Sequence, residues 1–328
     1  MSHARKNKPT WQPSASLEHL RFRATILTRI RDFFSSRDIL AVETPLLCQH
    51  SVTDPHIQSI SASLNQRSAA SKIYYLQTSP EYAMKRLLAA GCGAIYQITK
   101  AFRQDEIGHL HNPEFTLLEW YRPGFDHHHL MNEVDVFLQT ILNTTQAIRL
   151  TYQALFQRYL NIDPHHATLA ELQNCADQQN IHVHAELHDR DAWLNILMTH
   201  CIEPQLGKAN QPCFVYHFPI TQAALARIQP GVPPVAERFE VYVEGIELAN
   251  GFHELQDAAE QRQRFEKNIA ERRQAGLTEL TIDEHFLAAL THGLPDCSGV
   301  ALGIDRLIML AINSKQIADV LSFDFSKV

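Results

Sequence analysis

Helical periodicity marks the first element of the chain. Between residues 17 and 36, apolar residues recur at helical spacing with arginines between them, at Leu20, Ile26, Ile30, Phe33 and Phe34. That pattern predicts an amphipathic helix. The next stretch, residues 38–47, predicts a short strand closed by Pro45, because a proline suits a sheet edge or an interface better than a central strand.

Alternation of apolar and polar residues predicts two β-hairpins. The first joins residues 94–103 to residues 114–123. The second spans residues 238–252 and turns at Glu244–Gly245. Hairpin connections place neighbouring strands antiparallel, so both hairpins favour an antiparallel sheet.

Helices are expected around these strands. Residues 72–78 predict a further strand, followed by a helix with Ser79 as N-cap and Pro80 at its first position. Residues 127–230 predict a helix-rich inserted lobe with one strand at 213–219. Residues 257–274 predict a further helix, and residues 298–312 predict a strand, a glycine turn and a helix. The predicted fold is an α/β domain of the α+β type, an antiparallel sheet flanked by helices.

Composition limits the class of protein. A chain of 328 residues, 45% of them hydrophobic, can bury one large core. The net charge of −7 argues against broad nucleic-acid binding, although it leaves room for a local basic groove. Residues 1–16 are basic and polar, so we expect a flexible arm rather than a secretory signal, followed by one domain over residues 17–328.

Several cofactor sites are not predicted. No apolar run reaches the length of a membrane span, and the six cysteines form no CxxC pair, which suits a reducing cytosol. Residues 91–96 lack the third glycine of a dinucleotide fingerprint, and no GxxxxGK[ST] loop occurs. The run DHHHL at 126–130 is not expected to bind a metal, because adjacent histidines point apart and no second cluster lies at ligand spacing.

The first hairpin carries a candidate nucleotide site. A period of two places Phe115, Leu117, Glu119 and Tyr121 on one face, with Arg103 across the loop from Phe115. An aromatic ring can stack on adenine while a guanidinium holds phosphate oxygens. The alternative is an ordinary cation–aromatic pair on a solvated hairpin.

The second hairpin carries a candidate metal site. With the turn at Glu244–Gly245, Glu240 and Glu247 fall on the same face. Two converging carboxylates repel each other unless a cation lies between them, and Mg²⁺ that also touches phosphate is the expected occupant. The alternative is a salt bridge to Arg238.

A positive side chain in the first turn of a helix is the third feature. Arg306 stands there although the helix dipole disfavours it, so we expect it to contact an anion such as a nucleoside triphosphate. The alternative is pairing with Asp305 or another nearby carboxylate. Glu81, in the first turn of an earlier helix, is favoured by the dipole and needs no ligand to explain it.

These stretches together resemble the three motifs of class II aminoacyl-tRNA synthetases, and the likeness runs from residue 17 over nearly the whole chain. Motif 1 would be the helix and strand ending at Pro45, a homodimer interface. Motif 2 would be FRQDE…HNPEFTLLEWY and motif 3 GVALGIDRL. TSPEYAMKRLL, HNPEFTLLEWY and ELANGFHEL are most similar to lysyl-tRNA synthetase.

A missing domain narrows the resemblance. Only about sixteen residues precede motif 1, too few for the OB-fold domain that reads the anticodon in bacterial lysyl-tRNA synthetases. A catalytic domain of this length, beginning WQPSAS and carrying MKRLLAAGCG, RPGFDHHHLMNEVD, FVYHFP and GIELANGFHEL, resembles the family of elongation factor P lysyltransferases. That resemblance implies a cytoplasmic enzyme with ATP and Mg²⁺, (R)-β-lysine or lysine as substrate, elongation factor P as acceptor, and no tRNA or membrane partner.

The resemblance implies roles for the residues around ATP. Arg103 would bind the α-phosphate and Arg306 the γ-phosphate, with adenine between Phe115 and Arg306. Glu240 and Glu247 would hold Mg²⁺. The rest of the ATP pocket would be lined by Gln104, Asp105, Asn112, Leu248 and Gly303. The usual synthetase motif reads FRNE, so Gln104 and Asp105 differ from it by a methylene each.

It implies further roles around the amino acid. Asn250 would bind the carboxylate, while Tyr121 and Glu254 would take the ε-ammonium. Near the carboxyl end, the amino group would meet Ser79, Pro80 and Glu81. Ala301 stands where lysyl-tRNA synthetases usually have glycine, which is compatible with β-lysine. On a regular strand Asn250 and Glu254 would face away from Glu247, so we expect a bulge at Asn250–Gly251.

The implied reaction has two steps: adenylate formation, then transfer to a lysine ε-amine with release of AMP. A truncated lysyl-tRNA synthetase paralogue that charges tRNA is one alternative. A non-catalytic synthetase-like regulator is another, although such proteins usually lose the ATP arginines or metal carboxylates that this chain retains.

Overall fold

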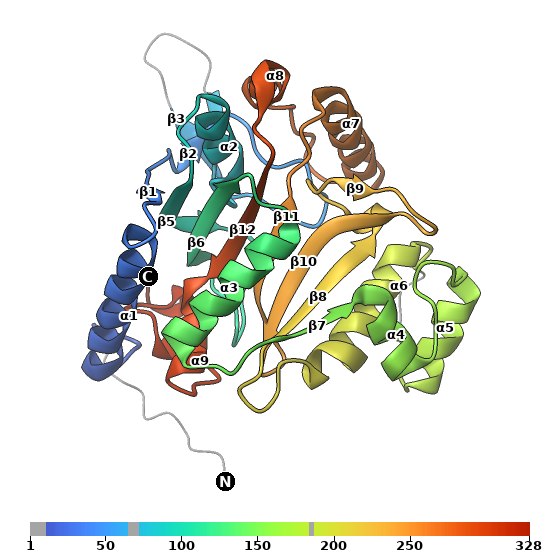
Figure 1. The fold of residues 1–328 in the computed structure, drawn as a ribbon, viewed down its shortest axis with the longest axis horizontal. Helices are drawn as coiled ribbons and strands as arrows, with labels where there is room; N and C mark the ends of the chain where they lie inside the picture. The colour runs from blue at the N-terminus through green and yellow to red at the C-terminus, as the bar shows by residue number, and fades with distance from the viewer. Residues whose placement is uncertain (1–10, 65–71, 184–186) are drawn as a thin grey trace.

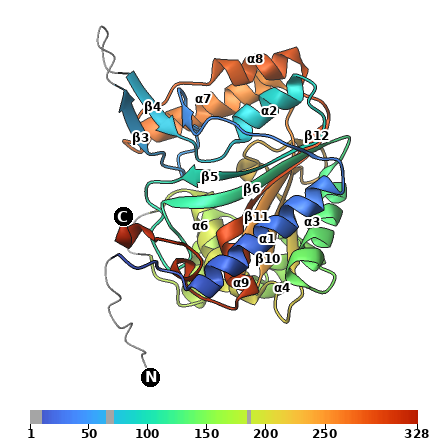
Figure 2. The same cartoon turned by 90° about the vertical axis from the view of Figure 1, so that its left-hand side faces the viewer.

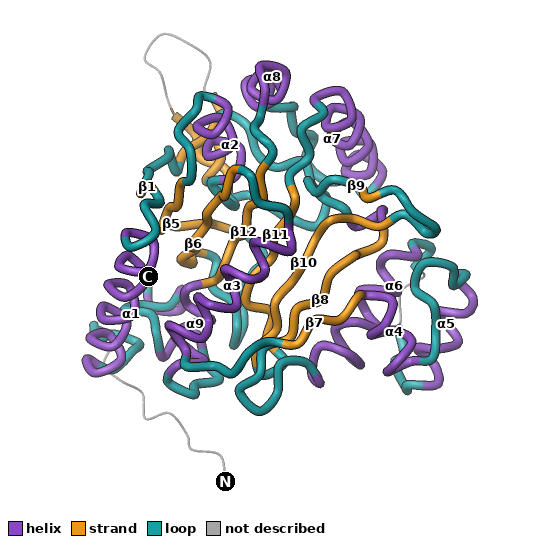
Figure 3. Tube along the Cα trace, in the orientation of Figure 1, coloured by secondary structure: helices purple, strands orange, loops and turns teal. Residues whose placement is uncertain are grey.

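The structure, a computed structural model, describes residues 11–64, 72–183 and 187–328. Its centre is a nine-stranded sheet in which helices surround the strands (Figures 1 and 3). The strand order is β1-β5-β6-β12-β11-β10-β8-β7, with β9 beside β10. In chain order these strands are β1 (Leu40–Ala41), β5 (Ile95–Phe102), β6 (Glu114–Pro123), β7 (Ile148–Thr151), β8 (Cys213–Pro219), β9 (Ile228–Gln229), β10 (Val235–Val243), β11 (Ile246–His253) and β12 (Cys297–Gly303).

The predicted hairpins are both present. β5 pairs antiparallel with β6, and β10 with β11, where Val243 faces Ile246 around the expected turn. The sheet is not wholly antiparallel, because β1–β5 and β7–β8 at its two ends are parallel pairs. A small second sheet holds β2 (Leu47–Cys48), β3 (Ser61–Leu64) and β4 (Lys72–Leu76).

Helices cover both faces of the large sheet (Figure 2). One face packs against α1 (Leu17–Ser35), α3 (His127–Leu142) and α9 (Ile304–Ala311) in the main hydrophobic core. The other carries α2 (Glu81–Ala89), α7 (Ala258–Gln274) and α8 (Glu284–Gly293), which share a separate core with Tyr121. The predicted first helix is confirmed: Ser16 caps it by accepting from the His19 amide, and it buries Ile26, Ile30, Phe33 and Phe34.

The helical lobe is smaller than predicted. α3 buries six apolar residues in the main core, so it belongs to the sheet rather than to an insertion. The lobe proper has its own core around α4 (Tyr152–Leu160), α5 (Leu169–Gln178) and α6 (Arg190–Leu197), with β8 beneath it. Two further strands, β7 and β9, also lie within residues 127–230 and were not expected.

The N-terminal arm is tied down where the structure describes it. The Ser14 and Ala15 amides donate to Ser322 and Leu321 carbonyls at 2.7 and 3.0 Å, so this part is held rather than flexible. Residues 1–10 of the predicted arm lie outside the described residues. Within the described ranges, no helix combines the length and the apolar character needed to cross a bilayer.

Candidate active site

Four side chains form a row across the centre of the sheet. Glu119 on β6 is the partner of Ala301 on β12, Ala301 of Asn250 on β11, and Asn250 of Glu240 on β10. Directly paired residues point to the same face, and strands lie about 4.8 Å apart, so the row is about 14 Å long. It lies on the α2 face, because the alternate residues of these strands enter the main core with α3.

A β-bulge brings Glu247 onto this face. Val241 pairs with Ala249 but Tyr242 pairs with Glu247, so Leu248 is the extra residue. An extra residue reverses the alternation, which puts Glu247 and Asn250 on one face. The bulge predicted at Asn250–Gly251 was therefore misplaced. Gly251 serves close packing instead, because a Cβ there would lie 2.4 Å from the Phe239 ring.

A buried lysine lies at one end of the row. Lys85 of α2 is 1% exposed, and its Nζ lies 2.6 Å from Glu81 Oε1 and 2.5 Å from Glu254 Oε2. Burial alone would lower the pKa of Lys85, but the two carboxylates outweigh it and raise that pKa above its ordinary value. Lys85 is therefore charged, and Glu254 already has a partner before any substrate arrives.

Glu119 is the carboxylate next to this pair. It accepts hydrogen bonds from Ser79 Oγ and from the Tyr121 hydroxyl, both at 2.7 Å. Burial is the main cause that raises the pKa of Glu119 to about 8, and repulsion from Glu81 is the next largest. We refer to Glu81, Glu119 and Glu254 as the acidic pocket. Gly299 is required beside it, because a Cβ would lie 2.2 Å from the Tyr121 ring and 2.6 Å from Glu254 Oε1.

Replacing Glu119 with glutamine should flatten the pH dependence of stability. The folded-state pKa of about 8 exceeds the ordinary value of 4.5. Ionisation of Glu119 therefore lowers the free energy of unfolding as the pH rises from about 4.5 to 8. Glu119→Gln removes that titration. Urea unfolding at pH 5.5 and 8 should show a smaller difference than in the unaltered chain. The exposed Glu279→Gln serves as control, and an unchanged difference in Glu119→Gln would contradict the burial argument.

Arg103 and Phe115 lie at the hairpin loop. The guanidinium carbon lies 5.2 Å from the Phe115 ring centroid, and Nη1 lies 2.8 Å from Glu106 Oε1. The cation–aromatic pair named as the alternative is thus present. The Arg103 side chain is about one-third exposed and its buried Nε has no hydrogen-bond partner among the described residues. One guanidinium edge is therefore left for an anion.

Arg306 is held by neutral groups. It donates to the carbonyls of Glu247 (2.8 Å) and Leu110 (3.4 Å), and Nη2 lies 2.7 Å from His111 Nε2. Asp305 instead pairs with Arg23 at 2.6 Å, so the alternative of an Arg306–Asp305 pair is wrong. No carboxylate among the described residues forms a salt bridge with Arg306, which keeps its charge available for a ligand.

Glu240 and Glu247 could hold a metal ion. Burial is the main cause that raises the pKa of Glu247 to about 7, and repulsion from Glu240 is the next largest. Glu240 accepts from Arg238 and from the Tyr242 hydroxyl, so the salt bridge named as the alternative exists as well. Glu203 is a third carboxylate near this pair. Its pKa is also raised, mainly by burial and secondly by repulsion from Glu240. A divalent cation would relieve this repulsion, so the donor set fits Mg²⁺.

Other residues expected to line an ATP pocket are placed less directly. Gln104 and Asp105 are exposed in the loop. The Asn112 side chain bonds the Glu114 carbonyl and the Phe325 amide, so it shapes the loop. Leu248 buries its side chain in the main core, which leaves only its backbone for a ligand. Gly303 ends β12 and is the N-cap residue of α9, where a Cβ would meet nothing closer than 3.8 Å.

The amino-acid end agrees with expectation at Asn250, but differs from it at the start of α2 and in two site residues that were not predicted. The N-cap of α2 is Pro80, while Ser79 Oγ accepts from the Glu81 amide and donates to Glu119. Asn250 Oδ1 is buried without a hydrogen-bond partner among the described residues, which suits a ligand-binding group. Lys85 and Glu119 were not predicted as site residues. Two features of the sequence could have indicated them. Glu81 and Lys85 are spaced by one helical turn, and Glu119 shares a strand face with Tyr121.

Comparison with known proteins identifies the class. A family model described as "tRNA synthetases class II (D, K and N)" matches residues 8–327, so the chain belongs to the class II tRNA synthetase family. A Salmonella arizonae protein named elongation factor P--(R)-beta-lysine ligase is 52% identical over 316 residues, 96% of this chain and 97% of that protein. A relative of the same name from Edwardsiella ictaluri is 52% identical over 322 residues, 97% of this chain and 98% of its own.

These comparisons confirm the resemblance read from the three motifs. They also establish the chain as a ligase rather than a non-catalytic regulator, because its relatives of nearly equal length are named ligases.

Proposed function

We propose that the chain activates (R)-β-lysine with ATP as an aminoacyl-adenylate and transfers it to a lysine ε-amine of elongation factor P. The observation that carries this proposal is the row from Glu119 to Glu240. It joins a buried acidic pocket, suited to an ammonium group, to a carboxylate pair and two arginines suited to Mg²⁺ and phosphates. The acceptor is the one in the names of the relatives.

At the nucleotide end, Arg103 would bind the α-phosphate and Arg306 the γ-phosphate, with adenine against Phe115. Support comes from the unpartnered Nε of Arg103 and from the neutral partners of Arg306. Mg²⁺ on Glu240 and Glu247 would neutralise phosphate charge and steady the pyrophosphate as it leaves. Gln104, Asp105, Asn112 and the backbone at Leu248 and Gly303 would complete the pocket.

At the amino-acid end, Glu119 would join Tyr121 and Glu254 around the ε-ammonium. Glu119 has no cation of its own among the described residues, whereas Glu254 shares Lys85 with Glu81. Asn250 would bind the carboxylate, since it lies between Ala301 and Glu240 in the row. Ser79, Pro80 and Glu81 would meet the second amino group.

Adenylate formation needs no general base. A carboxylate is already ionised at neutral pH, and it attacks the α-phosphorus while pyrophosphate leaves. Both reactants are anionic, so this chain's work is charge neutralisation and in-line positioning by Arg103 and Arg306. In the second step the acceptor ε-amine attacks the adenylate carbonyl, loses a proton, and displaces AMP to form an amide.

The assembly and compartment are also proposals. We propose a homodimer through α1 and the segment to Pro45, as the family resemblance implies. We propose a cytoplasmic enzyme because the acceptor is a translation factor.

Amino-acid-dependent exchange of pyrophosphate into ATP tests the first step. Exchange that requires Mg²⁺ and is faster with (R)-β-lysine than with α-lysine is expected. Acid-gel analysis of tRNA incubated with the chain should show no aminoacylation. Absence of exchange with either lysine would overturn the proposal, and charged tRNA would favour a truncated lysyl-tRNA synthetase.

Ala301→Gly should shift preference towards α-lysine. The Ala301 methyl stands between Glu119 and Asn250 on the pocket floor, so removing it opens space beside the substrate backbone. One methyl in a pocket typically changes discrimination by about tenfold or more. The ratio of kcat/KM for (R)-β-lysine over α-lysine in exchange should fall by that factor. Ala249→Gly, on the opposite face, is the control. An unchanged ratio in Ala301→Gly would contradict the placement.

A further inference from the structure

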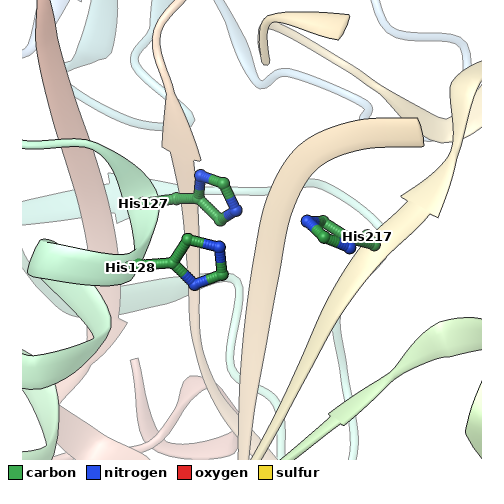
Figure 4. Close-up of side chains that lie close together, drawn as sticks. All are labelled: His127, His128 and His217. Carbon is green, nitrogen blue, oxygen red and sulfur yellow. The ribbon is translucent and has the colours of Figure 1, made fainter. Parts of the chain in front are cut away.

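Three histidines meet on the face of the sheet opposite the acidic pocket. His127 and His128 begin α3, and His217 lies within β8 (Figure 4). A ring nitrogen of each lies within 4.8 Å of one from each of the other two. The ring centroids of His127 and His128 are 4.1 Å apart, so these adjacent side chains do not point apart as predicted. The second group of ligands that the sequence did not reveal is His217, on a strand that lies far along the chain.

We propose that His127, His128 and His217 bind a zinc-type divalent transition-metal ion. Neutral imidazole is a preferred ligand of Zn²⁺ and similar ions. A tetrahedral ion holds its nitrogens about 3.4 Å apart, so modest ring rotation would close the remaining gap. The inference concerns these side chains alone and is independent of the proposed reaction.

Buried nitrogens without partners support the site. His127 is 2% exposed, yet neither of its ring nitrogens has a hydrogen-bond partner among the described residues, and Nε2 of His217 has none either. Leaving such groups unpaired is costly, so a ligand is the natural explanation.

The backbone of β8 is adapted to aim His217 at the pair. Between Phe218 and Tyr216, the single residue His217 faces two residues of β10, Glu237 and Arg238. His217 also has a φ of +60°, which non-glycine residues adopt at a cost. The extra residue of this bulge lies in β10, and the positive φ at His217 turns its side chain out of the regular alternation of β8. The strain is accounted for if the redirected imidazole has a ligand to bind.

The neighbouring histidine does not compete for the same role. His253 Nδ1 lies 2.6 Å from Glu237 Oε2, and Nε2 lies 2.8 Å from Asp296 Oδ1. Each ring nitrogen of His253 therefore already lies beside a carboxylate oxygen. Its carboxylate partner Glu237 has an oxygen within 4.8 Å of a His127 nitrogen. That negative charge, with Asp126 at the helix start, would offset the charge of a bound cation.

A bound ion would connect the two main parts of the molecule. α3 packs in the main core, whereas residues of β8 pack in the core of the helical lobe. We therefore expect Zn²⁺ to raise the midpoint of thermal unfolding, because it binds the folded chain in preference to the unfolded one.

Titration calorimetry of the full chain with Zn²⁺, after removal of metals with a chelator, tests the site. One ion per chain is expected. His217→Asn should weaken binding by about tenfold or more, because it removes a ligand while asparagine tolerates the same positive φ. His128→Ala serves as a second variant should His217→Asn not fold. His129→Ala is the matched control, since His129 belongs to the same run but is exposed and bonds Asp126.

Binding by the His129→Ala control equal to that of the unaltered chain, with loss in the His217 and His128 variants, supports the proposal. No binding, or equal binding in all variants, overturns it. So does a loss confined to a His253→Ala variant. Co²⁺ as a spectroscopic probe should give visible bands without a thiolate charge-transfer band. A strong thiolate band would assign the metal to one of the free cysteines and contradict the proposal.

Discussion

Replacing Arg103 with alanine is expected to lower adenylate formation by about a hundredfold to a thousandfold while leaving the fold intact. The guanidinium would stabilise charge that develops on the α-phosphate, and loss of one such donor typically costs a factor of about 10² to 10³. The structural cost is small, because the only salt bridge lost among the described residues is the part-exposed contact with Glu106. Pyrophosphate exchange measures the effect.

Arg122→Ala is a closely matched control for this experiment. Arg122 lies over the Phe125 ring at 4.7 Å and near Glu133 at 3.6 Å, the same pair of contacts that Arg103 makes, but it projects to the opposite face of β6. Exchange by Arg122→Ala should stay near that of the unaltered chain. Near-normal exchange by Arg103→Ala would contradict its assignment.

Replacing Lys85 with methionine is expected to lower the free energy of unfolding by about 3–5 kcal/mol. The variant removes the buried cation and leaves Glu81 and Glu254 facing each other without compensation. Lys267→Met is the control, because Lys267 also pairs with a glutamate one helical turn away but is exposed. That change should cost less than about 1 kcal/mol. Urea unfolding at pH 7 gives both values.

The loss in Lys85→Met should depend on pH. Burial raises the pKa of Glu254 to about 7 even with Lys85 opposing, so without Lys85 it should rise further. A raised carboxylate pKa destabilises the fold as the pH increases, so the deficit should shrink on acidification. A second change, Glu254→Gln, should restore part of the stability at pH 7. An equally small change in the free energy of unfolding for Lys85→Met and Lys267→Met would contradict the stabilising role of the buried ion pair.

Local patterns allow much of this fold to be predicted from the sequence. Alternation locates both hairpins, and the Glu244–Gly245 turn fixes the pairing of Tyr242 with Glu247. From that pairing alone it follows that Glu240 and Glu247 share a face of the hairpin. These inferences hold because hairpin register depends on a short turn.

Features that depend on distant contacts were not predictable in the same way. The bulge at Leu248 follows from pairing with two neighbouring strands and leaves no turn residue as a signal. Lys85 could be matched to Glu81 by helical spacing, but Glu254 reaches it only through the tertiary fold. His217 joins His127 only because β8 passes beneath the start of α3. In each case the deciding partner lies far along the chain.

Intact-protein mass spectrometry of elongation factor P tests the central claim most directly. Purified factor would be incubated with this chain, ATP, Mg²⁺ and (R)-β-lysine, beside reactions lacking ATP or containing the Arg103→Ala variant. The account predicts a mass gain of one lysyl group on the factor, only in the complete reaction with the unaltered chain. An unmodified factor in that reaction, when pyrophosphate exchange shows that the adenylate is made, would contradict it.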